Sequence, residues 1–432
     1  MSSFAEIEGK TAQPSRENIR KSLIASGVGN LLEWYDWTIY AVASIYIASA
    51  LFDKADPTSA LLNTLAVFAV GFVSRPIGGF VFGPLANKYG RKNIMLVTMV
   101  MMALASLMIA LIPSYEKIGA WASALLLIAR LVQGFAHGGE TATSYAYIAE
   151  IAPPKRRGLW SSMSFFAVGA GSLVATLFVA ILNIIYSEAQ MYEWVWRIPF
   201  AIGGVLAFFA IYLRRNMIET HIESEKNEQL DEVNWPLSKI LTSGFKLFWY
   251  EAGSTLTFYT WVSCAAIYAI GIQKMPAKDA FIMSCIAQVI YLICLPFQGL
   301  LSDYIGRKNN TLITYIGSSL LLFPLWSLIS NEPWTLLVAQ TIGLLMMGFL
   351  MSCKPAAMSE QVPTKYRTKF FGVFMSLAVT IFGGTASYVS TWLYSIDKGW
   401  IFNTYLISVS IIATLAVLTW KNNTGIDLNK IK

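Results

Sequence analysis

The sequence predicts an all-α membrane protein with twelve transmembrane helices, arranged as two pseudo-symmetric six-helix bundles. Three observations predict this fold class. Of the 432 residues, 56% are hydrophobic and 13% are charged, whereas soluble domains contain about 45–50% apolar and about 25% charged residues. The charged residues are clustered, and the apolar runs between them reach the ~20 residues that a helix needs to cross a bilayer. A loop sequence of the first half also recurs in the second half.

The apolar runs place the expected helices at 22–50, 59–83, 94–113, 121–150, 159–186, 195–214, 241–270, 280–302, 311–330, 333–359, 370–395 and 399–420. The first bundle is expected over residues 22–214 and the second over residues 241–420. Residues 215–240 are rich in charge and poor in apolar side chains, which predicts a cytoplasmic linker. Residues 1–21 and 421–432 are expected to be cytoplasmic tails, and the polar start of the chain does not predict a cleavable signal peptide.

The net charge of +7 raises nucleic acid as a partner, but the placement of the charges argues against it. With a cytoplasmic N-terminus, most of the 32 Lys and Arg residues fall on the cytoplasmic side, as the positive-inside rule requires. The exceptions lie near the outer ends of helices or inside them: Lys54, Lys117, Arg197, Lys274, Lys278, Lys398, Arg75, Arg130 and Lys354. The basic excess is therefore expected to set the orientation, with both termini cytoplasmic.

The repeated loop motif follows the second helix of each half. Residues 83–92 read GPLANKYGRK, and residues 299–308 read GLLSDYIGRK. A second repeat follows the fourth helix of each half at one constant displacement, and in it Glu150, Pro153 and Arg157 match Glu360, Pro363 and Arg367. Two matches in register predict a parallel duplication about an axis normal to the membrane.

These loop motifs resemble the signature of the major facilitator superfamily. Further segments resemble its metabolite:proton symporters, which include permeases for α-ketoglutarate, citrate, shikimate and proline or betaine: GNLLEWYD at 29–36, RPIGG at 75–79, Gly134 with GGE at 138–140, and WRIPF at 196–200. The resemblance covers nearly the whole chain. It implies the major facilitator fold and a secondary transporter of the bacterial cytoplasmic (inner) membrane that works by rocker-switch alternating access.

The resemblance also implies that both loops take part in gating. In the superfamily, the acidic residue of this motif caps a helix and pairs with charge in the other bundle, which stabilises the outward-open state. The second copy keeps the acid as Asp303, whereas the first has Asn87, which caps a helix but cannot form the charge pair. Either the first loop stabilises the outward-open state more weakly than the second, or it serves topology and folding only. The expected gating residues are Gly83, Asn87, Gly90, Arg91, Gly299, Asp303, Gly306, Arg307, Glu150, Arg157, Glu360 and Arg367.

Five residues of the first half are expected to couple transport to protons. Glu33 and Asp36 lie three apart near the middle of the first span, on one expected helix face. Carboxylates within the membrane mark ion or substrate pathways, and a static pair with a basic residue is the alternative. Arg130 begins RLVQG, which resembles the superfamily's proton-coupling motif, at a depth that matches Asp36. His137 and Glu140 follow on the same helix, and a packing role is the alternative for His137.

Arginines near a central cavity favour an anionic substrate, because guanidinium groups bind carboxylates bidentately. Arg75 lies within the second span, and Arg197 begins the sixth. The alternative for Arg197 is an interfacial anchor beside Trp194 and Trp196. The expected substrate-binding residues are Arg75, Arg197, Tyr35, Gln133 and Tyr259.

The second half contributes fewer charges within its helices. Glu251, Tyr259 and Tyr268 lie on the seventh span and are expected to face the substrate. Lys354 lies six residues before Glu360, near the cytoplasmic end of the tenth span, where it contributes to function or snorkels to the interface.

The expected function is import of a small organic acid, such as a di- or tricarboxylate, together with protons by a monomer. No cofactor and no metal are expected, because the four cysteines lack metal-ligand spacing and the chain has two histidines. One alternative is import of a zwitterionic osmolyte such as proline or betaine, although the residues after 420 lack the heptads of osmosensing relatives. Export of a drug or siderophore is a second alternative. A receptor or membrane enzyme is a third, but no nucleophile–base pair or phosphate loop supports an enzyme.

Overall fold

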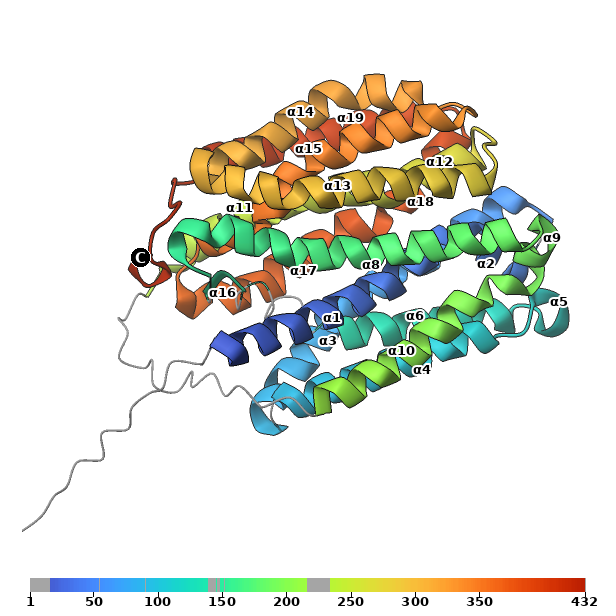
Figure 1. Cartoon of the computed structure of the whole chain (residues 1–432), viewed down its shortest axis with the longest axis horizontal. Coiled ribbons are helices and arrows are strands. Elements are labelled where there is room, and N and C mark those ends of the chain that lie inside the picture. The colour runs from blue at the N-terminus through green and yellow to red at the C-terminus, as the bar shows by residue number, and fades with distance from the viewer. Residues whose placement is uncertain are drawn as a thin grey trace, which may run out of the picture.

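The computed structural model describes residues 16–53, 55–89, 91–138, 145, 148–150, 152–215 and 234–431. Within these residues all regular secondary structure is helical. Figure 1 shows long helices running side by side, with those of the first half (blue to green) in one bundle and those of the second half (yellow to red) in the other. We call the end of the molecule at which the first helix begins the inner end, and the opposite end the outer end.

The first bundle contains the helices that precede residue 216. They are α1 (Arg16–Val42), α2 (Ser44–Leu51), α3 (Pro57–Tyr89), α4 (Arg91–Leu111), α5 (Tyr115–Ile118), α6 (Trp121–His137), η1 (Pro154–Arg156), α8 (Arg157–Ile185), α9 (Glu188–Gln190), η2 (Met191–Val195) and α10 (Arg197–Arg215). The backbone of α2 continues the direction of α1, so the two helices together form the first predicted span.

The second bundle contains the helices that follow residue 236. They are α11 (Leu237–Tyr259), η4 (Thr260–Cys264), α12 (Ala265–Gly271), α13 (Ala277–Ile305), α14 (Arg307–Leu328), α15 (Pro333–Ser359), α16 (Thr364–Phe370), η5 (Phe371–Met375), α17 (Ser376–Ala378), η6 (Val379–Gly383), α18 (Gly384–Ser395), α19 (Gly399–Leu418) and η7 (Leu428–Lys430). The segments η4, η5 and η6 are π-helical turns, a feature that is frequent at functional sites.

A helix occupies each of the twelve predicted spans within the described residues. By length and composition, seven of these helices can cross a membrane: 57–82, 154–185, 277–305, 307–328, 333–359, 371–395 and 399–418. Three shorter apolar helices, 96–111, 121–137 and 197–208, account for three further spans. The remaining two, α1–α2 and α11–α12, carry Glu33, Asp36 and Glu251, and such charges lower the hydropathy of a helix.

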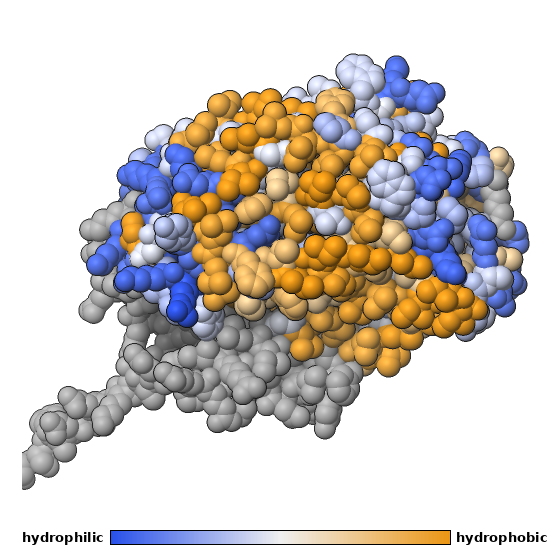
Figure 2. Space-filling view, turned by 45° about the horizontal axis from the view of Figure 1, so that its top comes forward, coloured by the Kyte–Doolittle hydropathy of each residue, from blue (hydrophilic) through white to orange (hydrophobic). Residues whose placement is uncertain are grey.

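The outer surface has the polarity of a membrane protein. Figure 2 shows hydrophobic residues in a broad belt over the middle of the molecule, with hydrophilic residues gathered at its two ends. Large apolar side chains such as Phe80 and Leu320 are 83% and 72% exposed. In water such a belt would be unfavourable, whereas in a bilayer these side chains face lipid.

Close backbone packing positions the second helix against the fourth. A side chain at Gly134 would overlap the carbonyl oxygen of Gly71, and one at Gly138 would overlap that of Arg75. A side chain at Gly78, which follows Arg75 in the chain, would likewise overlap the backbone of Phe135. This crossing brings Arg75 of α3 close to the end of α6.

The two bundles meet along α8 and α13, which pack against each other over their length (Figure 1). The helix α8 also contacts α15, and α3 contacts α18. These three contacts across the bundles surround the space in which the charged side chains of both halves lie.

Candidate functional site

A cavity of about 50 Å³ lies between the bundles. It has room for a few water molecules, since one water occupies about 10–15 Å³ of such space. Both bundles contribute to its lining, and the titratable and aromatic side chains among the lining residues are Arg75, His137, Glu251, Lys354, Trp34, Tyr145, Phe165, Phe258 and Tyr259. A cavity with charged groups from both halves is suited to bind a polar solute between them.

Arg75 presents unused hydrogen-bond donors to this cavity. Its residue is only 8% exposed, and its guanidinium carbon lies 3.9 Å from the ring centroid of Trp37 and 4.1 Å from that of Phe72. Among the described residues, its Nε and Nη2 atoms have no hydrogen-bond partner. The rings stabilise the cation but cannot accept from these N–H groups in the guanidinium plane. An arginine in this state favours a carboxylate ligand.

Glu33 and His137 form a buried pair beside Arg75. The carboxylate oxygen Oε1 of Glu33 contacts Nδ1 of His137, which lies in the last turn of α6. Their residues are 7% and 2% exposed. Imidazole and carboxylate together can hold one exchangeable proton, and His137 itself lines the cavity.

Asp36 lies in a different environment, deeper in the first bundle. Its Oδ2 accepts a 2.8 Å hydrogen bond from Ser106, whose hydroxyl accepts one of 2.8 Å from Gln133, and Gln133 in turn accepts one of 2.7 Å from Arg130. The structure thus joins Arg130 to Asp36 through two side chains, not by the direct contact that their depths suggested. Residues three apart lie on one broad helix face but are offset by about 60° around it, so Glu33 reaches His137 whereas Asp36 reaches Ser106.

Three predicted substrate-binding residues do not line the cavity. The Tyr35 hydroxyl donates to the carbonyl of Pro199, 2.9 Å away in α10, and Gln133 is used in the chain between Arg130 and Asp36. Arg197 lies at the outer end, where it donates to the carbonyl oxygens of Glu193 and Ile112 over 2.9 and 3.0 Å. Its guanidinium also lies 4.5 Å from the Trp196 ring, so the geometry of Arg197 is that of the interfacial anchor. The neighbour of Tyr35 on the chain, Trp34, lines the cavity instead.

Lys354 does not snorkel to the inner surface. Its Nζ lies 2.7 Å from Oε1 of Glu251, and the two residues are 5% and 1% exposed. The ammonium also lies 5.9 Å from the Tyr145 ring and 5.8 Å from the Phe165 ring. The pairing was not predicted, because the position of each residue along its own helix does not indicate that the two side chains meet. The available signal was the presence of one acid and one base among the apolar helices of the same half.

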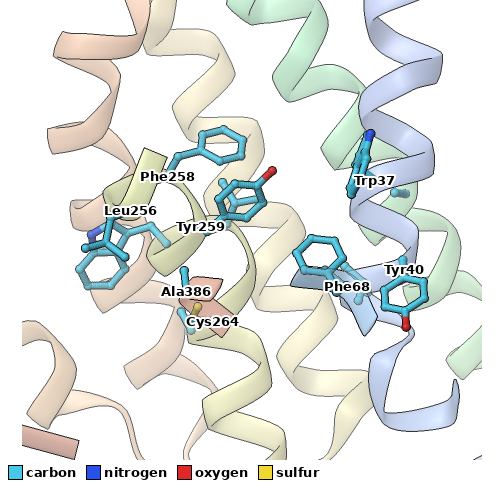
Figure 3. Close-up of a cluster of buried hydrophobic side chains, with 14 of the residues drawn as sticks. Trp37, Tyr40, Phe68, Leu256, Phe258, Tyr259, Cys264 and Ala386 are labelled. Atoms are coloured by element: carbon cyan, nitrogen blue, oxygen red, sulfur yellow. The ribbon is translucent and has the colours of Figure 1, made fainter. Parts of the chain in front are cut away.

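Aromatic side chains join the bundles on the outer side of this cavity. The rings of Trp34 and Phe258 lie 5.1 Å apart, and the Tyr259 ring lies 5.6 Å from Phe72 and 6.1 Å from Phe68. Figure 3 shows the side chains of Phe258 and Tyr259 facing those of Trp37 and Phe68 from the opposite bundle. Tyr259 therefore lies at the interface of the halves.

Tyr268, which was also expected to face the substrate, does not reach this interface. Its ring lies 4.5 Å from that of Tyr394 and 5.3 Å from that of Trp326, both within the second bundle. Its hydroxyl accepts a 2.6 Å hydrogen bond from Gln273.

Two ion pairs connect the bundles at the inner end. Arg157 of the first bundle lies 2.8 Å from Glu360 of the second, and Arg367 of the second lies 2.6 Å from Glu150 of the first. The repeated residues thus pair reciprocally, as in an interface with two-fold symmetry. Burial raises the pKa of Glu360, and the charges of Arg307 and Arg157 oppose this rise.

The second loop motif is bound to the first bundle. Asp303 accepts hydrogen bonds of 2.9 and 3.0 Å from the backbone N–H groups of Gly158 and Leu159, at the start of α8. It also lies 2.7 Å from Arg307. A carboxylate at a helix N-terminus is stabilised by the unpaired N–H groups and the helix dipole. Gly306, with φ of 92°, makes the turn between α13 and α14 in a conformation that favours glycine.

The close approach of the loop to α8 involves Gly299, because a side chain there would contact Ser162 and the carbonyl of Gly158. The corresponding environment in the first loop lies outside the described residues. Gly90 and Glu140 are not described, nor are the surroundings of Gly83 or the side chains of Asn87 and Arg91. Their expected roles remain predictions from the sequence.

Comparison with known proteins gives one family. The sequence matches the Major Facilitator Superfamily over residues 27–387 and 276–426. It is 36% identical over 406 residues to the alpha-ketoglutarate permease of Escherichia coli (strain K12), with 92% of each chain covered. It is 30% identical over 425 residues to the proline/betaine transporter of the same strain, covering 93% of this chain and 83% of that one.

A solved structure shares the fold. A crystal structure of a D-xylose-proton symporter superposes with a TM-score of 0.69 at 19% sequence identity, covering 96% of this chain and 99% of the symporter. At that identity the likeness concerns the fold alone.

Proposed function

Because this chain belongs to the major facilitator superfamily, we propose that it imports a small organic acid together with protons. Its relatives are transporters, not enzymes, and its helices make it a multi-pass membrane protein. In our proposal both termini are cytoplasmic, the membrane is the bacterial inner membrane and the monomer is the functional unit. The cavity is then the site that opens alternately to the outer and inner ends as the bundles rock.

The observation that carries this proposal is the state of Arg75. Its cation is buried at the cavity with two nitrogens that lack a hydrogen-bond partner among the described residues. Leaving buried donors unsatisfied is unfavourable, and a bound carboxylate would remove that penalty. A neutral sugar or an apolar drug would not offer these two nitrogens a charged acceptor.

Proton coupling is supported by energetics and by the neighbours of Arg75. An anion that enters a cell works against the negative interior, at about 2.3 kcal/mol per charge per 100 mV. Protons that enter with it remove this cost. The Glu33–His137 pair lies next to Arg75, and the chain from Asp36 to Arg130 lies behind it in the same bundle. We assign proton binding to these groups.

Uptake by the purified protein in proteoliposomes tests this function. An inward pH gradient should stimulate accumulation of labelled 2-oxoglutarate, succinate or citrate, and dissipating the gradient with an uncoupler should abolish that stimulation. If no carboxylate is accumulated under any gradient, symport of organic acids is wrong. Counterflow measured in both directions separates import from export of the same compounds.

Import of a zwitterionic osmolyte is the second candidate. Aromatic rings, among them Trp34, Phe165 and Phe258, form much of the cavity lining and suit a quaternary ammonium group. The proline/betaine relative supports the same reading. Competition decides between the two: excess betaine should leave 2-oxoglutarate uptake unchanged if the substrate is a carboxylic acid, whereas betaine uptake that excess 2-oxoglutarate does not reduce would favour the osmolyte.

A further inference from the structure

A second buried ion pair lines the cavity from the opposite bundle, and the proposed proton chemistry of the first bundle does not use it. Glu251 of α11 and Lys354 of α15 lie 2.7 Å apart and both line the cavity that Arg75 lines. Stability alone does not explain the pair, because burying two charges costs about as much as their attraction returns.

Glu251 and Lys354 can each form hydrogen bonds beyond the one between them. The Oε2 atom of Glu251 has no hydrogen-bond partner among the described residues. The Lys354 ammonium carries three N–H donors, and among the described residues it contacts one carboxylate oxygen and the faces of the Tyr145 and Phe165 rings. A carboxylate that enters the cavity can therefore bind to Lys354 in place of Glu251.

We propose that the cavity binds a dicarboxylate by its two ends, with one carboxylate on Arg75 of the first bundle and the other on Lys354 of the second. Glu251 occupies the place of the second carboxylate while the cavity is empty. This inference rests on the proposed function and narrows its substrate class. It also assigns to Lys354 and Glu251 roles in specificity.

Replacement of Glu251 by the substrate carboxylate on Lys354 also leads to uptake of a proton by Glu251. When the substrate takes Lys354, Glu251 would be left as a buried charge without its counterion, which is strongly unfavourable. Glu251 then takes up one proton from the outer solution, so the charge of the entering carboxylate is balanced. The titratable groups that face Glu251 are Lys354 on α15, the hydroxyls of Tyr145, Tyr250, Tyr259 and Tyr315, and, across the cavity, Arg75 and His137.

A dicarboxylate also links the two halves of the molecule. Arg75 lies on α3 and Lys354 on α15, so a ligand that contacts both holds the bundles together around the cavity. A monocarboxylate reaches one cation only and leaves the Glu251–Lys354 pair in place. The difference between these two ligand classes is therefore the observable consequence.

Calorimetry on the purified full-length protein measures that difference. Each ligand is titrated in buffers of different ionisation enthalpy, which gives the protons bound with it. The probes are 2-oxoglutarate and succinate, with pyruvate and butyrate as monocarboxylates. We expect the dicarboxylates to bind at least about tenfold more tightly, as one additional charged hydrogen bond predicts, and to take up about one proton more than the monocarboxylates.

The informative variant is the double substitution Lys354→Gln with Glu251→Gln. Replacing both partners leaves no unpaired buried charge, so it is expected to fold where Lys354→Gln alone can fail. The preference for dicarboxylates and the additional proton should both disappear, while binding of pyruvate is kept. Lys239→Gln is the matched control and should behave as the wild-type protein. It removes a cation that lies over the Trp235 ring at the start of α11, the helix that carries Glu251.

Two outcomes would overturn the inference. If the double variant keeps both the preference and the additional proton, Lys354 does not bind the second carboxylate. The same conclusion follows if the wild-type protein binds mono- and dicarboxylates equally. Were the wild-type protein to bind no carboxylate at all, the proposed function would fail together with this inference, and that result is distinct from the first two.

Discussion

Arg75 differs from the other buried arginines in what surrounds it. Arg157 and Arg367 are paired with glutamates of the opposite bundle, and Arg130 is bonded to Gln133 and covered by the rings of Trp37 and Tyr40. Arg75 alone among these four lines the cavity. At the scale of single residues, we therefore assign substrate binding and proton binding to this one guanidinium group and the Glu33–His137 pair beside it.

Substitution of Arg75 by lysine tests the geometry of that group. Lysine keeps the charge but loses the planar fork that binds a carboxylate through two parallel hydrogen bonds. We expect the KM for carboxylate uptake to rise at least about tenfold, the loss of one charged hydrogen bond. Initial rates in proteoliposomes measure this, with protein content and orientation matched to the wild type. A wild-type KM in Arg75→Lys would show that the bidentate contact is not made.

Substitution of His137 by glutamine tests proton coupling. Glutamine can bond to Glu33 but cannot take up a proton as imidazole can. The pH dependence of uptake should flatten, and stimulation by a pH gradient should weaken more than exchange of internal for external substrate. If Gln at this position leaves the pH profile intact, His137 is a packing residue.

At the scale of helices, contacts between α8, α13 and the connectors hold the inner end closed. Reciprocal pairing of Arg157 with Glu360 and of Glu150 with Arg367 joins the bundles there, and Asp303 caps α8 across the same interface. These contacts must break for the inner end to open. Their strength therefore sets the balance between the two conformations.

The pKa of Glu360 predicts how pH acts on that balance. Burial raises this pKa in the closed inner end, whereas the open conformation would expose the carboxyl and restore its ordinary value. The closed state then binds the proton more tightly, so acidification of the inner side should favour closure. Quenching by acrylamide of a fluorescent label, attached beforehand to a single cysteine introduced at the inner end, should weaken as the pH falls toward about 5.

The control for this effect is Glu360→Gln, which imitates the protonated carboxyl. Quenching in this variant should lose its dependence on pH over the same range. Stronger quenching of the wild-type protein on acidification would contradict the prediction.

Two substitutions, one that removes the acid of the second loop motif and one that adds an acid to the first, test whether the two motifs differ in gating. Asp303→Asn removes the charge from the start of α8, where it is favourable by about 0.3–1 kcal/mol, and should increase accessibility of the inner end. Asn87→Asp adds the missing charge to the first motif and should decrease it. Accessibility labelling and turnover measure both variants. Equal behaviour of the two variants and the wild type would limit these loops to topology and folding.

At the scale of the whole molecule, the fold was predictable because its signals are local in the sequence. Apolar run length and the repeated loops predicted the twelve spans and the two bundles, and both are confirmed. The repeat also singled out Glu150, Arg157, Glu360 and Arg367. That each arginine pairs with the glutamate of the opposite bundle is visible only in the three-dimensional structure.

The orientation of side chains around each helix was harder to predict. Trp34 faces the cavity and Tyr35 the adjacent α10, a difference of one position that apolar helices of this kind do not encode in their hydropathy. The Glu251–Lys354 pair depends on the tilt of two helices far apart in sequence. Helix rotation and tilt are set by packing between helices, which single-sequence patterns do not specify.

We propose above all that a carboxylate and protons enter together through the cavity at Arg75. Proteoliposomes loaded with a fluorescent pH indicator, with the membrane potential clamped, measure this most directly. Addition of 2-oxoglutarate or succinate should acidify the interior of wild-type vesicles at a rate proportional to substrate entry, and Arg75→Gln should lose both signals together. Substrate entry without acidification, or unchanged entry in Arg75→Gln, would contradict the account.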